Sequence, residues 1–343
     1  MKRLKAIQLA TIMTLVLAAG TIVAASATGY KVVKTYKLGG DGGWDYLTLD
    51  NSNHRLYISR ATRVMIVDIN SGKQVGEIAD TQGVHGIALV PDLGKGFTSN
   101  GRENTVSIFD LKTFKTLSKI KVGENPDAII YDPASKRIFT FNGKSHDATA
   151  IDADKGTVAG TIKLEGKPEF AVSDEKGEVF VNIEDKNQLD VLDSNKLEEK
   201  AHWPLAPCDS PSGLAIDRKN RRLFSGCDKL MAIVNADNGK LVSTLPICDG
   251  VDATAYDDET HLAFASCGDG KLTVVEEESP DKFSVAESVD TQKGARTMAL
   301  DPKSHNVYTV TANFGPRPEP TAQSPHPRPP VLPESFVLLM VGK

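Results

Sequence analysis

The chain has 343 residues, of which 40% are apolar and 25% are charged. This globular composition excludes fibrous and intrinsically disordered proteins, because it supplies enough apolar side chain to fill a core. The formal net charge is −5, which argues against the binding of a nucleic acid backbone as the main activity.

The first 27 residues are predicted to form a signal peptide. Lys2, Arg3 and Lys5 precede an apolar run at 10–25, and a small-residue cleavage site ends at Ala27. Secretory leaders have these features in this order. The alternative is an uncleaved anchor, since the run is near the lower length limit for a membrane span. Cleavage removes three positive charges and takes the formal net charge from −5 to −8. The mature chain is then acidic, has no membrane span and is periplasmic or secreted.

Residues 28–343 are predicted to form one domain made of seven repeats. The repeat at 85–125 alternates apolar and polar residues in four short segments, which is typical of a four-stranded propeller blade. Copies begin at intervals of 40 to 44 residues, at Trp44, His85, Pro126, Pro168, Pro211, Val251 and Ala295. So small a sheet cannot bury both of its faces alone, and neighbouring sheets must stack around an axis. The expected fold is an all-β, seven-bladed β-propeller with antiparallel blades.

Within each repeat, the second and third strands have the clearest patterns. Second strands are expected at 55–60, 96–100, 137–142, 178–182, 222–227, 262–267 and 306–313. Third strands are expected at 64–68, 106–110, 149–152, 189–193, 231–235, 272–276 and 336–342. The last repeat then lacks a fourth strand, while 30–38 has the pattern of one. We therefore expect the N-terminal segment to complete the last blade and close the ring.

Several second-strand segments resemble the Tyr-Val-Thr-Asn (YVTN) repeat, at 56–60, 96–100, 138–142 and 307–311. The segment 126–133 resembles the usual lead-in of that repeat. The chain is thus similar to the YVTN-repeat, YncE-like β-propellers of the bacterial envelope over nearly all of its mature residues. This resemblance implies a scaffold class whose members mostly lack an assigned activity, and it carries over no catalytic residue.

Residues just inside each first strand are expected to surround one mouth of the central channel. They are Asp45, Gly86, Asp127, Glu169, Ser212, Asp252 and Arg296, with His85 beside Gly86. We predict a ligand site at this mouth. The carboxylates of Asp45, Asp127, Glu169 and Asp252 suit Ca²⁺ or Mg²⁺. Alternatively, water or strand amides satisfy these carboxylates. His85 is expected to be a loop or packing residue rather than a ligand.

The four cysteines are placed as two equivalent pairs. Cys208 and Cys227 are 19 residues apart, as are Cys248 and Cys267, and the pairs are displaced by 40 residues, which is one blade. The loop before a first strand and the end of the second strand are neighbours, so two disulfides within blades are favoured. The alternatives are a bridge from Cys227 to Cys248 across blades and a four-cysteine metal site.

A proline-rich loop at 315–335 is inserted in the last blade and holds eight of the 18 prolines. It takes the place of a short turn on the predicted funnel face. This composition favours an extended arm, which could cover the channel mouth or present 327–330 to a partner. The alternative is a disordered insertion.

Familiar catalytic motifs are absent from the sequence: it contains no Walker loop, dinucleotide fingerprint, HExxH or GxSxG. The expected function is therefore that of an exported, monomeric binding or scaffold protein, with a small molecule, cation or protein at the funnel face. The alternative is a metal-dependent hydrolase or lactonase, with a divalent ion held by Asp127, Glu169 and Asp252.

Overall fold

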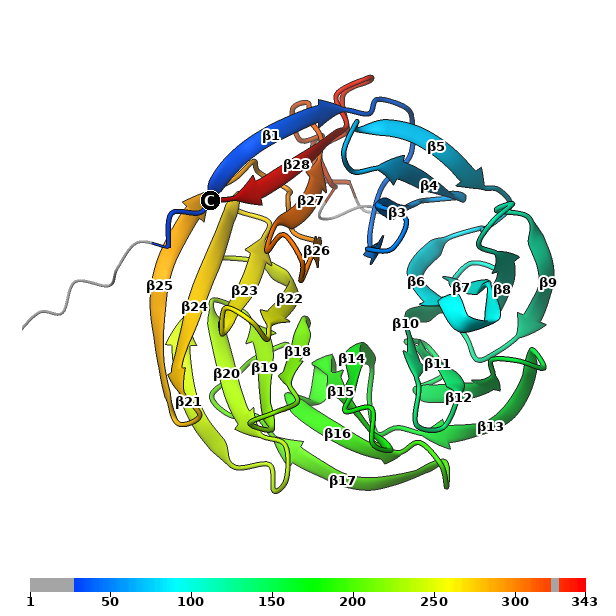
Figure 1. The fold of residues 1–343 in the computed structure, drawn as a ribbon, viewed down its shortest axis with the longest axis vertical. Coiled ribbons are helices and arrows are strands. Elements are labelled where there is room, and N and C mark those ends of the chain that lie inside the picture. Colours follow the sequence, from blue (N-terminus) through cyan, green and yellow to red (C-terminus); the bar gives the residue numbers. More distant parts are fainter. Residues whose placement is uncertain (1–27, 322–326) are drawn as a thin grey trace, which may run out of the picture.

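The structure is a computed structural model that describes residues 28–321 and 327–343. The predicted signal peptide lies outside these residues. Seven four-stranded antiparallel sheets surround a central channel (Figure 1), which confirms the seven-bladed propeller. No helix in the described part of the chain is long and apolar enough to cross a membrane.

The first three blades follow each other in chain order. Blade 1 contains β2 (Leu47–Asp50), β3 (Arg55–Arg60), β4 (Arg63–Asp68) and β5 (Lys73–Ile78). Blade 2 contains β6 (Val84–Val90), the 3₁₀ turn η1 (Pro91–Leu93), β7 (Lys95–Asn100), β8 (Thr105–Asp110) and β9 (Thr116–Lys121). Blade 3 contains β10 (Pro126–Asp132), β11 (Arg137–Asn142), β12 (Asp147–Asp152) and β13 (Thr157–Lys163).

The remaining blades repeat this order, and the last of them takes its outer strand from the start of the chain. Blade 4 contains β14 (Pro168–Ser173), β15 (Glu178–Ile183), the 3₁₀ turn η2 (Glu184–Lys186), β16 (Gln188–Asp193) and β17 (Glu198–Pro204). Blade 5 contains β18 (Leu214–Asp217), β19 (Arg222–Cys227), β20 (Leu230–Asn235) and β21 (Leu241–Pro246). Blade 6 contains β22 (Val251–Asp257), β23 (Leu262–Cys267), β24 (Lys271–Ser279) and β25 (Lys282–Asp290). Blade 7 contains β26 (Met298–Leu300), β27 (Val307–Thr311), β28 (Val337–Gly342) and β1 (Lys31–Lys37).

Ring closure occurs as the sequence predicts. The N-terminal strand β1 pairs antiparallel with β28, from Lys31 opposite Gly342 to Lys37 opposite Val337. The preceding Tyr30 is 3% exposed, and its ring lies edge-on to Phe264 of blade 6 at 5.3 Å. The Tyr30 hydroxyl also donates a hydrogen bond to the backbone oxygen of His305. The start of the described chain thus joins blades 6 and 7.

The core lies between neighbouring blades rather than in one central mass. Each second strand contributes one aromatic residue at the same register, and all seven are buried: Tyr57, Phe97, Phe139, Phe180, Phe224, Phe264 and Tyr308. Blades 2 and 3, for example, share a cluster in which Phe97 and Ile108 meet Ile129 and Ile151. Burying an aromatic side chain of this kind stabilises a fold by roughly 1.5–3 kcal/mol. The repeated aromatic therefore explains why the second-strand pattern is so regular in the sequence.

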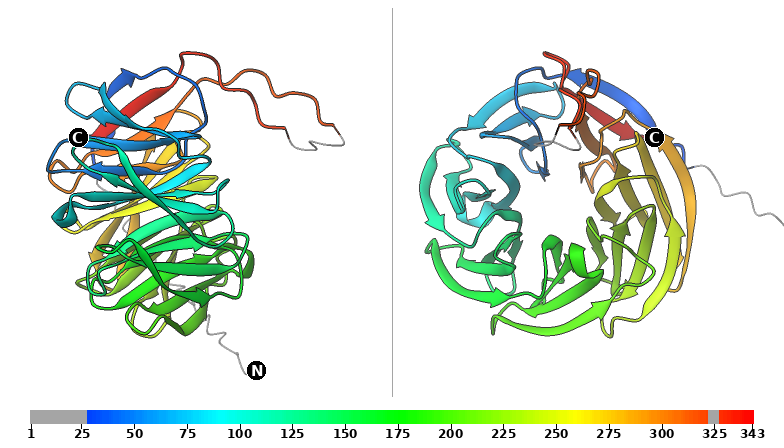
Figure 2. Two further views of the ribbon diagram at one scale, coloured as in Figure 1. Left: turned by 90° about the vertical axis from the view of Figure 1, so that its right-hand side faces the viewer. Right: turned by 180° about the vertical axis from the view of Figure 1, so that it is seen from behind.

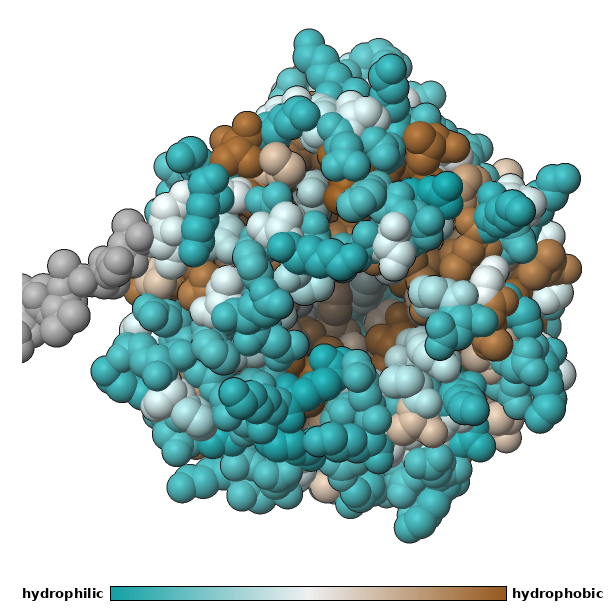
Figure 3. Space-filling model, in the orientation of Figure 1, coloured by the Kyte–Doolittle hydropathy of each residue, from teal (hydrophilic) through white to brown (hydrophobic). Residues whose placement is uncertain are grey.

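The two faces of the ring differ. On one face, which we call the arm face, the proline-rich insertion rises between β27 and β28 (Figure 2). The opposite face carries the turns between first and second strands. Figure 3 shows this opposite face, which is covered mainly by polar residues and hollowed at its centre.

Aspartates end most of the first strands at the opposite face and organise the turns there. They are Asp50, Asp132, Asp217, Asp257 and Asp301. Asp132, for example, accepts hydrogen bonds from the Ser135 amide at 2.9 Å, the Ser135 hydroxyl at 2.6 Å and the Ser173 hydroxyl at 2.5 Å. These buried carboxylates have structural partners, and they are not candidates for a ligand site.

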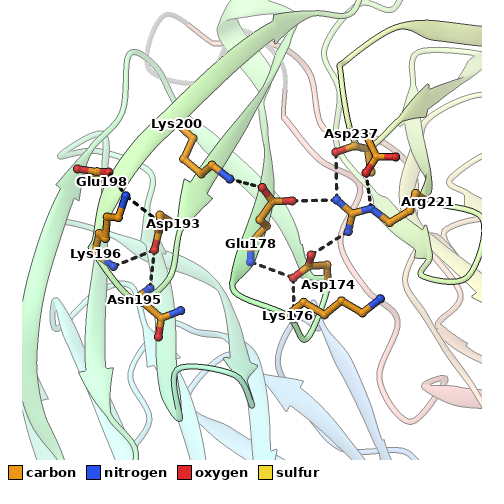
Figure 4. A network of polar contacts seen from close by, with 11 residues as sticks. Asp174, Lys176, Glu178, Asp193, Asn195, Lys196, Glu198, Lys200, Arg221 and Asp237 are labelled. Carbon is orange, nitrogen blue, oxygen red and sulfur yellow. Dashed lines mark hydrogen bonds and ion pairs between the residues drawn. The ribbon is translucent and has the colours of Figure 1, made fainter.

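An arginine network joins blades 4 and 5 (Figure 4). The Arg221 guanidinium reaches Asp174 at 2.8 Å, Glu178 at 2.8 Å and Asp237 at 2.7 Å. Burial alone would lower the pKa of Arg221, but its hydrogen bonds to Asp237, Glu178 and Asp174 raise the pKa overall. The three carboxylates thus hold the Arg221 guanidinium in place. This guanidinium connects the turn between β14 and β15 in blade 4 to two turns of blade 5, between β18 and β19 and between β20 and β21.

Candidate binding site at the channel mouth

The candidate site lies where the first strands begin, on the arm face. In blades 2, 3, 4 and 6 the pairing of the first strand with the second shifts register within the first few residues. Such bulges release residues from the ladder and re-aim their side chains. His85, Asp127, Glu169 and Asp252 all lie within these irregular stretches. In the other three blades, Asp45, Ser212 and Arg296 precede the first paired residue of the strand.

The register of blade 2 corrects one residue of the predicted ring. Val84 pairs with Asn100 as Pro126 pairs with Asn142 in blade 3, so His85 occupies the position of Asp127. Gly86 lies one residue further along. A Cβ there would meet the Ile129 side chain at 2.7 Å, so only glycine fits against blade 3. His85 is thus a member of the ring.

Three of the ring residues form one compact group. His85 Nδ1 lies 2.6 Å from the Asp45 carboxylate and 3.7 Å from that of Asp127. Burial lowers the pKa of His85, but the hydrogen bond to Asp45 and the charges of Asp127, Asp45 and Glu169 raise it overall. One ligand atom from each of Asp45, His85 and Asp127 lies within 4.8 Å of the other two, so this group could hold a metal ion.

The other two carboxylates of the predicted ring are engaged by cations. Glu169 forms an ion pair with Lys167, which also reaches Glu184. Asp252 pairs with Arg296 at 3.1 Å, and Arg296 extends to Asp45 at 3.6 Å. The four carboxylates therefore surround the mouth but do not converge on one point. We call Asp45, His85, Asp127, Glu169, Asp252 and Arg296 the mouth residues.

Burial and mutual repulsion disfavour the ionised forms of the carboxyl groups at the mouth. Burial, followed by the charges of neighbouring acids, raises the pKa of Glu169 to about 8 and that of Asp252 to about 7. The pKa of Asp127 is also raised, mainly by burial, while His85 acts in the opposite direction. Each ionised carboxylate disfavours ionisation of the others. A bound cation would relieve this repulsion.

Two aromatic rings form the floor beneath the mouth residues. Tyr46 of blade 1 stacks on Phe170 of blade 4, with ring centroids 4.6 Å apart and planes 25° apart. Blades 1 and 4 are not neighbours in the ring, so this contact spans the channel. The Tyr46 hydroxyl is buried without a hydrogen-bond partner among the described residues. Burial and the charges of Asp127 and Glu169 raise its pKa well above the usual value.

The aromatic floor is the feature that the sequence analysis missed. Tyr46 and Phe170 stand one residue after the ring position, where blades 2, 3, 5 and 6 have Gly86, Ala128, Gly213 and Ala253. Two large aromatics among such small residues are a signal that a comparison of the repeats could have detected. We call the space bounded by the mouth residues and these two rings the cup.

Serine hydroxyl groups hold the backbone of the mouth in place. Ser99 accepts a hydrogen bond from the Gly86 amide at 2.8 Å and donates one to the Asp127 carbonyl of the next blade. Ser59 accepts from the Asp45 amide at 3.1 Å. Ser212, which is predicted to be a ligand residue, donates a hydrogen bond to the Asp252 carbonyl of the next blade at 3.2 Å.

The predicted disulfides within blades are confirmed. Cys208 bonds to Cys227 and Cys248 to Cys267, with Cα atoms 5.5 Å and 5.8 Å apart. Each bridge joins the loop before a first strand to the end of the second strand. The two bridges therefore secure the side of the mouth that carries Ser212 and Asp252.

The proline-rich insertion forms an arm made of the described residues 315–321 and 327–333. Its base is paired: Gly315 donates to the Pro330 carbonyl at 2.8 Å, and Leu332 donates to the Asn313 carbonyl at 2.8 Å. Figure 2 shows that the arm leaves the ring and projects outward from the face. The described part of the arm therefore stands beside the mouth and does not lie across it.

These features define the class of protein: a seven-bladed β-propeller with two aromatic rings stacked across its channel beneath an acidic mouth. No protein-family model matches the sequence, and no curated protein matches it significantly. Among solved structures, the chain is similar to hydrazine synthase of Kuenenia stuttgartiensis, with a TM-score of 0.70 and 16% identity over 79% of this chain and 94% of that one. It is also similar to U3-55K, with a TM-score of 0.74 and 9% identity over 91% of this chain and 99% of that one. At these identities the similarity shows the fold alone.

Proposed function

We propose that the protein is an exported binding protein that holds a positively charged ligand in the cup formed by the mouth residues and the aromatic floor. The observation that carries this proposal is the set of crowded carboxylates, with raised pKa values, above two stacked aromatic rings that span the channel. Structural carboxylates normally obtain hydrogen-bond donors of their own, whereas the nearest cation to Asp127 is His85 at 3.7 Å and its other neighbours at the mouth include acids. A cation in the cup would supply the missing charge.

The cup suits two kinds of cation. The Asp45, His85 and Asp127 group offers oxygen and nitrogen ligands to a divalent metal ion. The ring faces of Tyr46 and Phe170 that are not covered by their mutual stack would be the aromatic surface for an organic ammonium group. Both kinds of cation depend on the charge of Asp127, which makes this residue the decisive one to change.

The test is a binding titration of the mature, chelator-treated protein with Mn²⁺, Zn²⁺, Ca²⁺ and spermidine. At least one of these cations should bind saturably, and Asp127→Asn should weaken it by at least about tenfold. The matched control is Asp228→Asn, which removes an exposed carboxylate from a neighbouring loop of the same face. Equal affinity in Asp127→Asn and Asp228→Asn would contradict a site in the cup.

A metal-dependent hydrolase is the second candidate, and the compact Asp45, His85 and Asp127 group is the observation that favours it. A divalent ion there would supply an activated water at neutral pH. Metal-loaded protein should then hydrolyse a simple lactone, and a chelator should abolish the activity. Metal binding without any turnover would leave the binding protein as the function.

Export and family membership are part of the same proposal. The leader at 1–27 and the YVTN-like strand ends support an envelope β-propeller, and the two disulfides fit an oxidising compartment. We propose that the mature chain acts as a monomer. Expression with and without residues 1–27, followed by fractionation, tests the location.

A further inference from the structure

A second hollow lies on the arm face, where the base of the arm meets blades 1, 6 and 7. Its volume is about 540 Å³, which is in the usual range for small-molecule sites. It is lined by Gly43, Trp44, Gly268, Gly294, Arg296, Phe314, Arg317, Arg328, Pro329 and Val331. An adjoining pocket shares Phe314, Arg317 and Pro329 and adds Lys293. We call the two together the arm cleft.

The arm cleft is basic although the chain is acidic. Arg296, Arg317, Arg328 and Lys293 line it, and none of the described residues that line it is an Asp or a Glu. Arg296 is shared with Asp252 and Asp45 of the mouth. Arg317, Arg328 and Lys293 form no ion pair with any residue in the described part of the chain. The cleft thus has positive charge that direct ion pairs among the described residues do not balance.

One wall of the arm cleft is aromatic and is backed by a buried cation. The Trp44 ring lies 6.1 Å from Phe314 and 5.2 Å from Phe336 between ring centroids. Behind Phe336, the Arg60 guanidinium is fully buried, 3.6 Å from the centroid of that ring. It donates to the backbone oxygens of Gly40 and Asp41 at 2.9 Å, but its Nε and Nη1 have no partner among the described residues. This unpaired charge adds to the positive potential of the wall.

We propose that the arm cleft binds a small organic anion, a carboxylate or phosphate carried on a planar apolar body. The arginine side chains match the geometry of an oxyanion, because a guanidinium donates two parallel hydrogen bonds. Trp44, Phe314, Pro329 and Val331 give the apolar surface against which the body of the ligand packs. The site does not depend on a cation in the cup.

The chain offers an intrinsic probe for this proposal. It has only two tryptophans, Trp44 in the arm cleft and Trp203 on the outer strand β17 of blade 4. The variant Trp203→Phe leaves Trp44 as the single tryptophan. Its fluorescence is measured during titration with benzoate, phenyl phosphate and inorganic phosphate. We expect a saturable change in fluorescence with benzoate or phenyl phosphate. The compound with the lower dissociation constant identifies the anionic group that the site prefers.

Substitutions then locate the site. Arg317→Ala and Arg328→Ala, in the Trp203→Phe background, should each weaken binding by about tenfold. The matched control Arg102→Ala, an exposed arginine in the equivalent loop of blade 2, should leave it unchanged. Asp127→Asn should also leave it unchanged, which separates this site from the cup. Both arm arginines are exposed, so unchanged thermal midpoints will show that these variants are folded.

Two results would overturn the proposal. The first is a fluorescence response that is absent, or that is equally present in Arg317→Ala and Arg328→Ala. The second is inorganic phosphate binding as tightly as phenyl phosphate and benzoate, because the aromatic wall would then contribute nothing.

Discussion

The two ends of β10 carry aspartates that behave in opposite ways. Asp127 is the second residue of β10 and lies at the mouth, and Asp132 is the last residue of the strand and lies at the opposite face. Asp132 is fully buried, yet hydrogen bonds from Ser135, Ser173 and Ser194 outweigh burial and lower its pKa. Asp127 is more exposed, yet burial and the charge of Asp45 outweigh His85 and raise its pKa. The hydrogen bonds that a carboxylate accepts therefore distinguish Asp132, which is part of the fold, from Asp127, which is open to a ligand.

The largest effect on stability should come from deletion of the N-terminal strand β1, which closes the ring of blades. Deletion of residues 30–38 removes β1, its ladder with β28 and the buried Tyr30. We expect a loss of at least about 5 kcal/mol in the free energy of unfolding, summed from lost hydrogen bonds and aromatic burial. Denaturant unfolding measures it. Unchanged cooperative unfolding would show that the ring does not depend on this strand.

Matched substitutions at the two ends of β10 test the comparison directly. Asp132→Ala leaves the Ser135 amide and two serine hydroxyls without their acceptor, and should cost about 2–4 kcal/mol of unfolding free energy. Asp127→Ala removes a carboxylate that its neighbours repel, and should change stability by less than about 1 kcal/mol. Equal losses in the two variants would show that both aspartates are structural.

The pH dependence of stability should follow the raised pKa values at the mouth. Glu169 and Asp252 have folded pKa values of about 8 and about 7, both above their unfolded values of roughly 4. Their protonated forms therefore stabilise the fold, and this contribution is fully present below about pH 4 and is lost as the pH rises to about 8. The thermal midpoint of ligand-free protein should fall over this range, and a bound cation should restore it at pH 8.

Asp190 provides the control for that measurement. It is fully buried in blade 4, and burial raises its pKa to about 7, so it lowers stability over part of the same pH range. Asp190→Asn should raise the midpoint at pH 8 without affecting the restoration by a cation. The double variant Glu169→Gln, Asp252→Asn should flatten the profile and remove the restoration. A double variant that keeps the wild-type profile would exclude the mouth as its origin.

The smallest effect is expected at the floor of the cup. The Tyr46 hydroxyl is buried without a partner among the described residues, so Tyr46→Phe removes a polar group that gains nothing from the fold. Thermal unfolding should show a change within about 1 kcal/mol, in the stabilising direction. A clear loss of stability would reveal that the hydroxyl has a partner, such as a water molecule bridging to the mouth.

The sequence predicts those features that recur once per blade. The seven sheets, the closing strand and both disulfides can be predicted from spacings near 40 residues. Each blade packs equivalent strands against its neighbours, so equivalent residues recur at that spacing. Features that depend on contacts between different blades are harder to predict from the sequence. The repeat spacing predicts Gly86 and not His85 at the ring position, because the partners of His85, Asp45 and Asp127, lie one blade away on either side. The stack of Tyr46 on Phe170 joins blades that no local pattern relates.

The stack of Tyr46 on Phe170 also links blades 1 and 4 directly across the axis. Tyr46 directly precedes the first strand of blade 1, and Phe170 lies in the first strand of blade 4. A ligand that moved either ring would therefore act on two blades that are not neighbours along the chain.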